Sequence, residues 1–381
     1  MIARLPLLAA LAAAALGAAG CQPVMKEPEV AAPVMRLRWR LVTSDRSKEL
    51  GPQEFASAVA AGDHVYTGSA GGRFYAVGAK DGHLRWTSQL GSVSSRPAIA
   101  GNRLFIGTDD GELLSVDMLT GEVVWKYETR GPILESPVIV GDLVIFSNEA
   151  DQVYALDARK GTFRWQYKGE TPEEYTLRGH AGDGHAGDLA LTGFANGTLV
   201  ALRVTTGSVA WLTTIKGDSD RFVDVDGTPI VVGDTVYVTS SSGGLWALDR
   251  ATGLVRWRQP LQGTTPSQSV GTAGGLTTDG QRLFVTAADL GVYAFDLDGN
   301  LLWRQGTRGG GEPATPAVSG DYLVYALAGA GVYVADKRSG QVLEYFDPGD
   351  GISGDPTVVG DQELFVMSNR GVLYALDLDT L

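Results

Sequence analysis

Cysteine is nearly absent from this chain, which has one, Cys21, among 381 residues. A single thiol offers no internal disulfide and no cysteine pair for a cofactor site. Blocks of lysine and arginine are missing too, and the formal net charge is −13. This balance excludes the basic surface that a nucleic-acid partner requires. No serine stands in a recognisable nucleophile elbow, so nucleophilic hydrolysis has little support.

Long hydrophobic runs are also scarce, and the prominent one lies in the N-terminal segment MIARLPLLAALAAAALGAAGC. Its apolar core, residues 5–16, is too short for a comfortable bilayer span and suits a secretion signal. The ending AAGC resembles the lipobox of bacterial lipoproteins, although Ala18 stands where leucine is usual. The resemblance implies cleavage before Cys21 and attachment of diacylglycerol to its sulfur. An ordinary signal peptide that contains a cysteine is the alternative.

The residues after Cys21 indicate where such a protein would be anchored. Gln22 is not the aspartate associated with retention at the inner membrane, so the periplasmic face of the outer membrane is favoured. The segment QPVMKEPEVAAPVMR, residues 22–36, has three prolines and little pattern, as expected of a tether. We therefore divide the chain into a signal peptide (1–20), a lipidated tether (21–36) and a folded body (37–381).

One repeated unit fills the folded body. Each unit has a glycine, usually followed by Asp or Asn, between two β-rich runs, with spacings of 39 to 47 residues. These glycines are Gly62, Gly101, Gly141, Gly187, Gly233, Gly280, Gly320 and Gly360. Four strand-like runs in a period of 40 to 50 residues indicate a β-propeller. We predict an all-β fold with eight blades.

The phrase ALDxxTGxxxW recurs in variants and ends most units on a tryptophan. The series is Trp86, Trp125, Trp165, Trp211, Trp257 and Trp303, with Tyr345 expected at the same place in the seventh unit. The eighth unit stops before any tryptophan, and the missing strand is predicted around Trp39 near the N-terminus. That strand would complete the last blade and remove an open edge.

The pattern resembles the repeat of pyrroloquinoline-quinone (PQQ) enzymes, in which glycine and tryptophan dock neighbouring blades. This resemblance raises an oxidoreductase as one alternative. Quinoprotein dehydrogenases are longer and hold an adjacent cysteine pair beside the cofactor, whereas this chain has one cysteine. We therefore expect no cofactor and no catalytic residue.

Function on a repeat scaffold is expected where units depart from the consensus. Four connections between blades are longer than the others, at residues 40–61, 166–186, 212–232 and 258–279. The last three are consecutive and should form one raised sector on one face. One holds EEYTLRGHAGDGH and another holds RFVDVDGTPIVV, in which aromatic, Leu and Arg side chains accompany acids. This combination suits protein docking, although ordinary solvated loops remain an alternative.

YTLRG followed about forty residues later by RFVDVDG resembles the BamB family, lipoproteins of the outer-membrane β-barrel assembly machinery. The resemblance implies a non-catalytic scaffold that docks the periplasmic domains of BamA, the central barrel subunit, as a monomer within a hetero-complex. Nascent outer-membrane proteins are a weaker implied partner. The residues implied in docking are Leu177, Arg178, Asp224 and Asp226, with Arg221 in support and Tyr175 where the family often has an aliphatic residue.

Three other hypotheses compete for these loops. Asp224 and Asp226 have a spacing that could suit a glycosidase, but nearby Arg221 would lower both pKa values rather than raise one. His180 and His185 bracket Asp183 and could bind a transition metal, although the spacing matches no familiar zinc arrangement. A different lipid-anchored propeller that binds a small ligand or a polysaccharide would share every feature except the two special loops.

Overall fold

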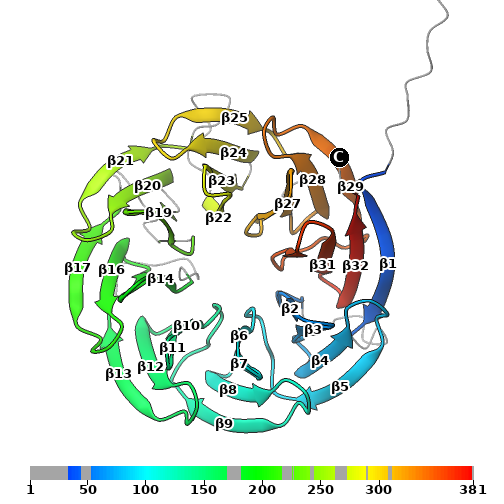
Figure 1. Cartoon of the computed structure of the whole chain (residues 1–381), viewed down its shortest axis with the longest axis horizontal. Helices are drawn as coiled ribbons and strands as arrows, with labels where there is room; N and C mark the ends of the chain where they lie inside the picture. The colour runs from blue at the N-terminus through cyan, green and yellow to red at the C-terminus, as the bar shows by residue number, and fades with distance from the viewer. Residues whose placement is uncertain are drawn as a thin grey trace, which may run out of the picture. The chain divides into compact units, whose positions relative to one another are not determined.

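The repeated units form the blades of one closed ring (Figure 1). The computed structural model describes residues 33–43, 53–169, 182–216, 225, 227–240, 244–261, 273–288, 291–307 and 311–379. Within these ranges, 32 strands form eight antiparallel sheets of four strands each. The predicted all-β, eight-bladed propeller is therefore confirmed.

Each blade runs from an inner strand at the central axis to an outer strand at the rim (Figure 1). Blade 1 comprises β2 (Val59–Ala61), β3 (His64–Thr67), β4 (Arg73–Gly78) and β5 (Leu84–Gln89), and blade 2 comprises β6 (Ala98–Ala100), β7 (Arg103–Gly107), β8 (Glu112–Asp117) and β9 (Val123–Glu128). Blade 3 comprises β10 (Val138–Val140), β11 (Leu143–Asn148), β12 (Gln152–Asp157) and β13 (Phe163–Lys168), and blade 4 comprises β14 (Gly184–Ala186), β15 (Leu189–Gly193), β16 (Thr198–Arg203) and β17 (Val209–Thr214). Blade 5 comprises β18 (Ile230–Val232), β19 (Thr235–Ser240), β20 (Gly244–Asp249) and β21 (Val255–Gln259), and blade 6 comprises β22 (Ala273–Thr278), β23 (Arg282–Ala287), β24 (Gly291–Asp296) and β25 (Leu301–Gln305). Blade 7 comprises β26 (Ala317–Ser319), β27 (Tyr322–Ala326), β28 (Val332–Asp336) and β29 (Val342–Phe346), and blade 8 comprises β30 (Thr357–Val359), β31 (Glu363–Met367), β32 (Val372–Leu378) and β1 (Met35–Val42).

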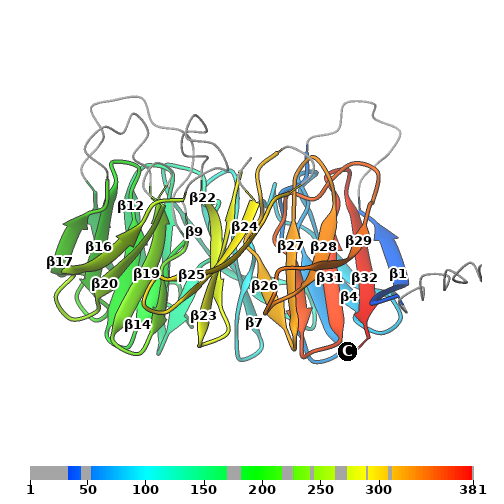
Figure 2. The ribbon, with the colours of Figure 1, turned by 90° about the horizontal axis from the view of Figure 1, so that it is seen from above.

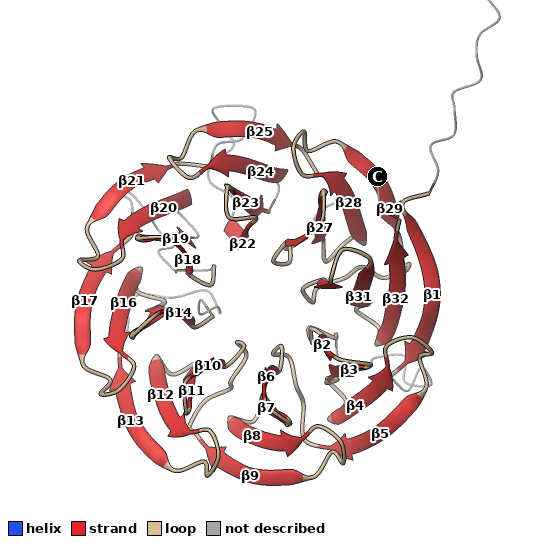
Figure 3. Cartoon of the chain, in the orientation of Figure 1, coloured by secondary structure: helices blue, strands red, loops and turns tan. Residues whose placement is uncertain are grey.

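The hydrophobic core lies between the blades rather than in one central mass. Phe105 and Leu113 of blade 2, for example, pack with Val144 and Phe146 of blade 3. Middle strands are buried on both faces and are rich in Val, Leu and aromatic residues, whereas outer strands alternate in exposure because one face meets solvent. Figure 3 shows strands and loops only, and no described segment is a helix long and apolar enough to cross a membrane.

Tryptophans on the outer strands join most blades to the next, as predicted. Trp86 of blade 1 donates its indole N–H to the Met118 carbonyl of blade 2 at 2.9 Å. Its ring covers Gly121, where a Cβ would lie 2.5 Å from the ring and where φ is +74°. Glycine is thus required at that turn by both close approach and backbone conformation. The same indole–carbonyl bond joins Trp39 to Ala79, Trp125 to Ala158, Trp165 to Val204, Trp211 to Arg250 and Trp303 to Lys337.

The seventh blade corrects one sequence expectation. In the other blades, tryptophan pairs with a small residue just before a β-bulge, as Trp257 does with Ala247. In blade 7, the residue at that register is Glu344, opposite Val334, so the expectation that Tyr345 replaces the tryptophan is wrong. The aromatic residue is displaced by one position along the strand. The recurring phrase TGxxxW already places this position four residues after Gly340, at Glu344, and a shift of one residue reverses the face of a side chain.

Glu344 has a role that a tryptophan could not fill. Its carboxylate accepts hydrogen bonds from the backbone N–H groups of Val34 and Met35, at 2.5 and 2.6 Å. In blade 8 the third and fourth strands come from opposite ends of the chain, so no turn glycine joins them for a tryptophan to cover. The start of β1 presents backbone N–H groups there instead, and a carboxylate binds them through charge-assisted hydrogen bonds.

The N-terminal strand closes the ring, as predicted. β1 pairs antiparallel with β32, from Met35 opposite Leu378 to Val42 opposite Val372. Figure 2, a view at 90° to that of Figure 1, shows β1 beside β32 at the rim of blade 8. We call β1 the closing strand. It removes the edge of β32 that would otherwise be open to pairing with another chain.

We expect Glu344→Ala to lower the free energy of unfolding by about 2 kcal/mol, because two backbone N–H groups lose a charged acceptor. Glu344→Gln, which keeps an acceptor oxygen, should cost about half as much. Urea unfolding followed by tryptophan fluorescence measures both. Equal stability of Glu344→Ala and the wild type would contradict a role in closure.

Candidate functional site

All the residues implied in lipidation and docking lie outside the described part of the chain. They are Cys21, Tyr175, Leu177, Arg178, Arg221, Asp224 and Asp226. The described residues that flank them show where the two special connections leave and re-enter the ring. The first runs from Gly169, after β13, to Gly182, before β14. The second leaves after β17 at Lys216 and returns through Gly227 to β18, so the two connections flank blade 4.

A buried phenylalanine of blade 4 supports both connections. Phe194 lies in the hairpin between β15 and β16 and is 1% exposed. Gly169, where the first connection begins, approaches so closely that a Cβ there would lie 2.8 Å from the Phe194 ring. From the second connection, the Val225 N–H donates to the Phe194 carbonyl at 3.4 Å. One hairpin therefore brings the described ends of both special connections together.

Val225 anchors the second connection to the propeller. It is fully buried, forms an isolated β-bridge with Ser240 of blade 5, and belongs to the apolar cluster that includes Leu199 and Val238. Two residues later, the Gly227 N–H donates to the Thr239 carbonyl at 3.5 Å. The Val225 side chain therefore turns towards the propeller.

Carboxylates gather where the connections enter the inner strands, a feature that the sequence analysis missed. Glu135 precedes β10, Asp183 precedes β14 and Asp355 precedes β30. Burial raises the pKa of Glu135 to about 8, and the charges of Asp355, Asp183 and Glu149 add to the rise. These residues precede the repeat glycines Gly141, Gly187 and Gly360 by six, four and five residues, so aligning the repeats does not bring them together.

An arginine partly offsets these charges. Arg96 of blade 2 donates to the backbone carbonyls of Asp355 and Pro356 at 3.4 and 3.2 Å, and its guanidinium lies 3.9 Å from the Asp355 carboxylate. These bonds connect blade 2 to blade 8 past blade 1. Asp355 also accepts a hydrogen bond from the N–H of Thr315, which precedes β26 of blade 7. The cluster therefore links several blades near their inner strands.

The residues considered for a metal site are not brought together in the described part. Asp183 is buried and accepts a hydrogen bond from the Thr192 hydroxyl, while His185 is exposed on β14. His180 lies outside the described residues. Among those that are described, no group of three or more His, Cys, Asp or Glu side chains could hold a metal ion.

The eight blades and their indole contacts define the chain as a β-propeller of PQQ-like repeats. A sequence model described as "Outer membrane protein assembly factor BamB" matches residues 36–103, 86–270 and 231–380. The chain therefore belongs to the family of the outer membrane protein assembly factor BamB.

Individual proteins agree with this assignment. The assembly factor BamB of Burkholderia pseudomallei is 32% identical over 257 residues, which span 65% of this chain and 64% of that protein. The chain thus aligns with somewhat under two thirds of that relative's length. The crystal structure of BamB from Moraxella catarrhalis has a TM-score of 0.74 at 24% identity and covers 91% of this chain and 100% of that one.

The fold alone is also shared with enzymes. A quinohemoprotein alcohol dehydrogenase from Pseudomonas putida has a TM-score of 0.72 at 14% identity, covering 90% of this chain and 76% of the dehydrogenase. At that identity the likeness concerns the arrangement of blades. Function must be inferred from the sites that each chain carries.

Proposed function

We propose that this chain is a non-catalytic scaffold in the assembly of outer-membrane proteins, docking the periplasmic domains of the central barrel subunit, BamA. The observation that carries the proposal is the joint support of two special connections by blade 4. Family membership supports a role in the assembly of outer-membrane proteins, because the matching relatives are named as assembly factors for that process. The meeting of their described ends at Phe194 supports the choice of these two connections as the docking surface.

Residue alternation assigns directions within the second connection. Side chains along an extended chain point alternately to opposite sides. Val225 is buried, so we expect its neighbours Asp224 and Asp226 to face away from the propeller and towards a partner. They would accept charge-assisted hydrogen bonds there, with Arg221 beside them.

The first connection would supply the complementary chemistry. We propose that Leu177 contributes buried apolar contact and Arg178 pairs with a carboxylate or carbonyl of the partner, with Tyr175 beside them. Apolar and arginine anchors at the centre of an interface commonly carry most of its binding energy. Oppositely charged groups in the two connections would fix the orientation of the partner.

Anchoring completes the proposal. We propose that the chain is cleaved before Cys21, lipidated there, and held at the periplasmic face of the outer membrane by the tether of residues 21–36. The closing strand begins at Met35, so the last two residues of this segment, Met35 and Arg36, already belong to the propeller. Metabolic labelling with an alkyne fatty acid should mark the wild type, and a Cys21→Ser variant should remain unlabelled.

The docking surface is tested by capture of the purified periplasmic domains of the central barrel subunit. We expect Leu177→Ala/Arg178→Ala and Asp224→Ala/Asp226→Ala each to weaken binding at least tenfold, which corresponds to about 1.4 kcal/mol or more. Biolayer interferometry with the folded variants gives the dissociation constants.

A matched control lies on blades 4 and 5, the two blades that the special connections lead into. Asp188 and Asp234 stand in the glycine turns after β14 and β18, at the other end of those strands, with 79% of each side chain exposed. Asp188→Ala/Asp234→Ala removes the same charge and should bind as the wild type does. Unchanged binding by both docking variants would refute the surface. A small ligand that raises the melting temperature while no barrel subunit binds would favour the ligand-binding alternative.

A further inference from the structure

The outer strand of each blade has one edge that pairs with no described strand. It is the last member of its sheet, so that β17 of blade 4, for example, pairs only with β16. Such an edge presents backbone N–H and C=O groups to solvent, where another extended chain can pair with them. Charged side chains commonly guard the edge against this pairing.

Among the eight outer strands that the structure describes, β17 alone has no charged residue. Its sequence is VAWLTT, and the uncharged run extends from Val204 to Ile215. Blade 4 therefore lacks the guard that the other seven edges have. The charged residues of those edges are Arg85 on β5, Lys126 and Glu128 on β9, Arg164 and Lys168 on β13, Arg256 and Arg258 on β21, Arg304 on β25, Glu344 on β29, and Arg36, Arg38 and Arg40 on β1.

The position after the tryptophan shows the difference directly. In blades 2 and 5 it holds Lys126 and Arg258, whereas in blade 4 it holds Leu212. Leu212 lies opposite Val200 of β16 and is 53% exposed, and Val209 at the start of β17 is 46% exposed. Neither Leu212 nor Val209 belongs to the hydrophobic clusters that join blade 4 to its neighbours. The edge of β17 is thus bordered by exposed aliphatic side chains.

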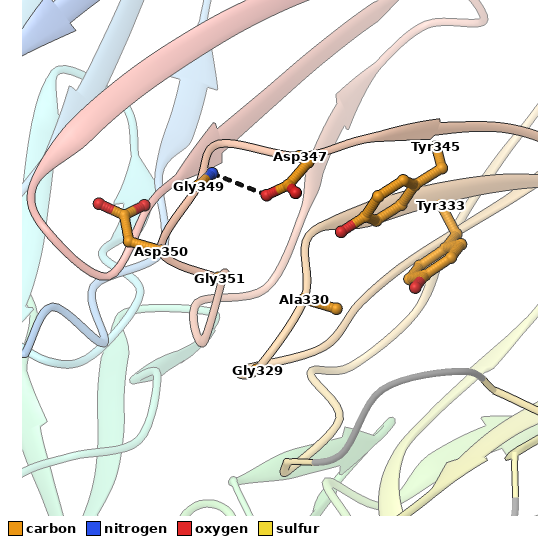
Figure 4. A pocket seen from close by; sticks show the side chains of 8 residues that line it. All are labelled: Gly329, Ala330, Tyr333, Tyr345, Asp347, Gly349, Asp350 and Gly351. Carbon is orange, nitrogen blue, oxygen red and sulfur yellow. Dashed lines mark hydrogen bonds between the residues drawn. The ribbon is translucent and has the colours of Figure 1, made fainter.

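Blade 7 has an uncharged side chain at the same position, but its surroundings differ. Tyr345 lies opposite Tyr333, and the two ring centroids are 4.5 Å apart. Figure 4 shows these two rings side by side at the wall of a pocket. The next residue on that strand, Glu344, has a charged side chain. A packed ring and a charge therefore distinguish this edge from that of β17.

The blade holds β17 in place while the pairing edge faces outward. The Trp211 indole N–H donates to the Arg250 carbonyl of blade 5 at 2.9 Å, and the Thr213 hydroxyl donates to the Gly253 carbonyl at 2.7 Å. Both bonds use side chains and leave the backbone groups of the outer edge unaffected. Figure 1 shows β17 at the rim of the ring with no described strand beyond it. A partner would meet a strand that is already ordered, which lowers the cost of binding.

We propose that β17 pairs with an extended segment of an unfolded outer-membrane protein, which adds to blade 4 as a further strand. The strands of outer-membrane barrels alternate apolar and polar side chains over about ten residues. Such a segment offers apolar groups to Leu212 and has no charge that would require a charged partner. Pairing through the main chain is independent of sequence and suits many different clients. Desolvating a charged edge beneath an apolar strand would be costly, and β17 avoids this cost.

This inference rests on the role of the family in outer-membrane protein assembly, but not on the docking connections. β17 lies between the two connections in the sequence and shares no residue with either. The docking variant Leu177→Ala/Arg178→Ala should therefore bind a strand peptide as the wild type does. Failure of the docking surface and failure of the strand site can thus be told apart.

Fluorescence anisotropy with the peptide fluorescein-Gly-Thr-Leu-Thr-Val-Thr-Leu-Thr-Lys-Lys-amide tests the proposal. We expect saturable binding to the wild-type protein. A peptide methylated on the backbone nitrogens of its four central residues keeps every side chain but blocks both of its edges. It should bind at least about tenfold more weakly, because several amide donors are lost. Equal binding of the two peptides would overturn pairing through the main chain.

Two matched variants locate the binding. Leu212→Lys gives β17 the charge that Lys126 gives β9, and should weaken binding at least about fivefold while the melting temperature is kept. Thr87→Lys makes the equivalent change at an exposed position of blade 1, which lies opposite Tyr75, and should bind as the wild type does. Undiminished binding by Leu212→Lys, or equal weakening by Thr87→Lys, would refute the site.

Sedimentation velocity distinguishes a client segment from a second copy of this chain. We expect the wild type to remain a monomer at the concentrations at which it binds the peptide. A dimer that Leu212→Lys abolishes, together with no binding of the peptide, would assign the edge to self-association and overturn the proposal.

Discussion

Arg38→Ala is expected to lower the free energy of unfolding by about 3 kcal/mol, because it leaves partly buried Glu363 without its cation and Asp377 with only the exposed Arg36. Arg38 on the closing strand binds Glu363 of β31 at 2.6 Å and also pairs with Asp377 of β32. Only 19% of its side chain is exposed, against 28% for Glu363 and 20% for Asp377. It also donates to the Ala79 carbonyl of blade 1 at 3.1 Å. One side chain thus joins three strands of blade 8 and the next blade.

Arg38 and Asp377 stand where Arg256 pairs with Asp249 in blade 5 and Arg164 with Asp157 in blade 3, but in blade 8 the pair joins strands from opposite ends of the chain. In blade 5 the equivalent Asp249 accepts the backbone N–H groups of Ala251 and Thr252 in the turn between the third and fourth strands. Blade 8 has no such turn, because its fourth strand comes from the N-terminus. Although burial opposes ionisation of Asp377, the hydrogen bonds and charge of Arg38 hold its pKa below the usual value.

Urea unfolding at neutral pH measures the effect, with Arg85→Ala as the control. Arg85 pairs with Asp81 at a surface turn where 39% and 42% of the side chains are exposed, so its removal should cost less than about 1 kcal/mol. Similar losses in the two variants would show that closure does not depend on Arg38. Because the weakened closing strand exposes the edge of β32, we also expect Arg38→Ala to form dimers or aggregates near its unfolding midpoint.

Glu135→Gln is expected to stabilise the protein at pH 8.5 by about 2–4 kcal/mol and to have little effect at pH 4.5. The pKa of Glu135 rises from 4.5 to about 8 in the folded protein, through burial first and then through Asp355, Asp183 and Glu149. Between these values the folded state binds more protons than the unfolded state. The wild-type free energy of unfolding therefore falls as pH rises from 4.5 to 8. Glutamine keeps the shape of the protonated carboxyl and removes this dependence.

The difference in unfolding free energy between Glu135→Gln and the wild type should be measured at several pH values from 4.5 to 8.5. The other titrating groups are common to both proteins and largely cancel in that difference. Glu128→Gln serves as the control, because 71% of the Glu128 side chain is exposed beside Lys126 and no pH-dependent gain is expected. A difference for Glu135→Gln that stays constant with pH would contradict the raised pKa.

Glycine and tryptophan positions were predictable because each is fixed by a local requirement. A tight turn needs a positive φ, and a ring that covers such a turn needs a glycine beneath it, so spacing alone reveals the blades. Trp39 was identified as the closing residue because the last repeat lacked a strand that the first segment supplied.

One error is local to blade 7, whereas the main omission concerns residues of different blades. Tyr345 was taken for the missing tryptophan, but the pairing of β28 with β29 puts Glu344 there. The carboxylates at Glu135, Asp183 and Asp355 come from three blades and are far apart in the sequence. Their mutual repulsion arises only when the ring closes.

The sequence by itself thus determined the eight blades, the closing strand and the family, because repeat period, turn chemistry and alternation are encoded within short segments. Only the tertiary structure decided what holds the two ends of the chain together, which hairpin supports both special connections, and which carboxylates gather near the inner strands. Each depends on which residues of different blades meet in space. That is set by the register between strands and the closure of the ring, and a change of one residue in register exchanges one face of a strand for the other.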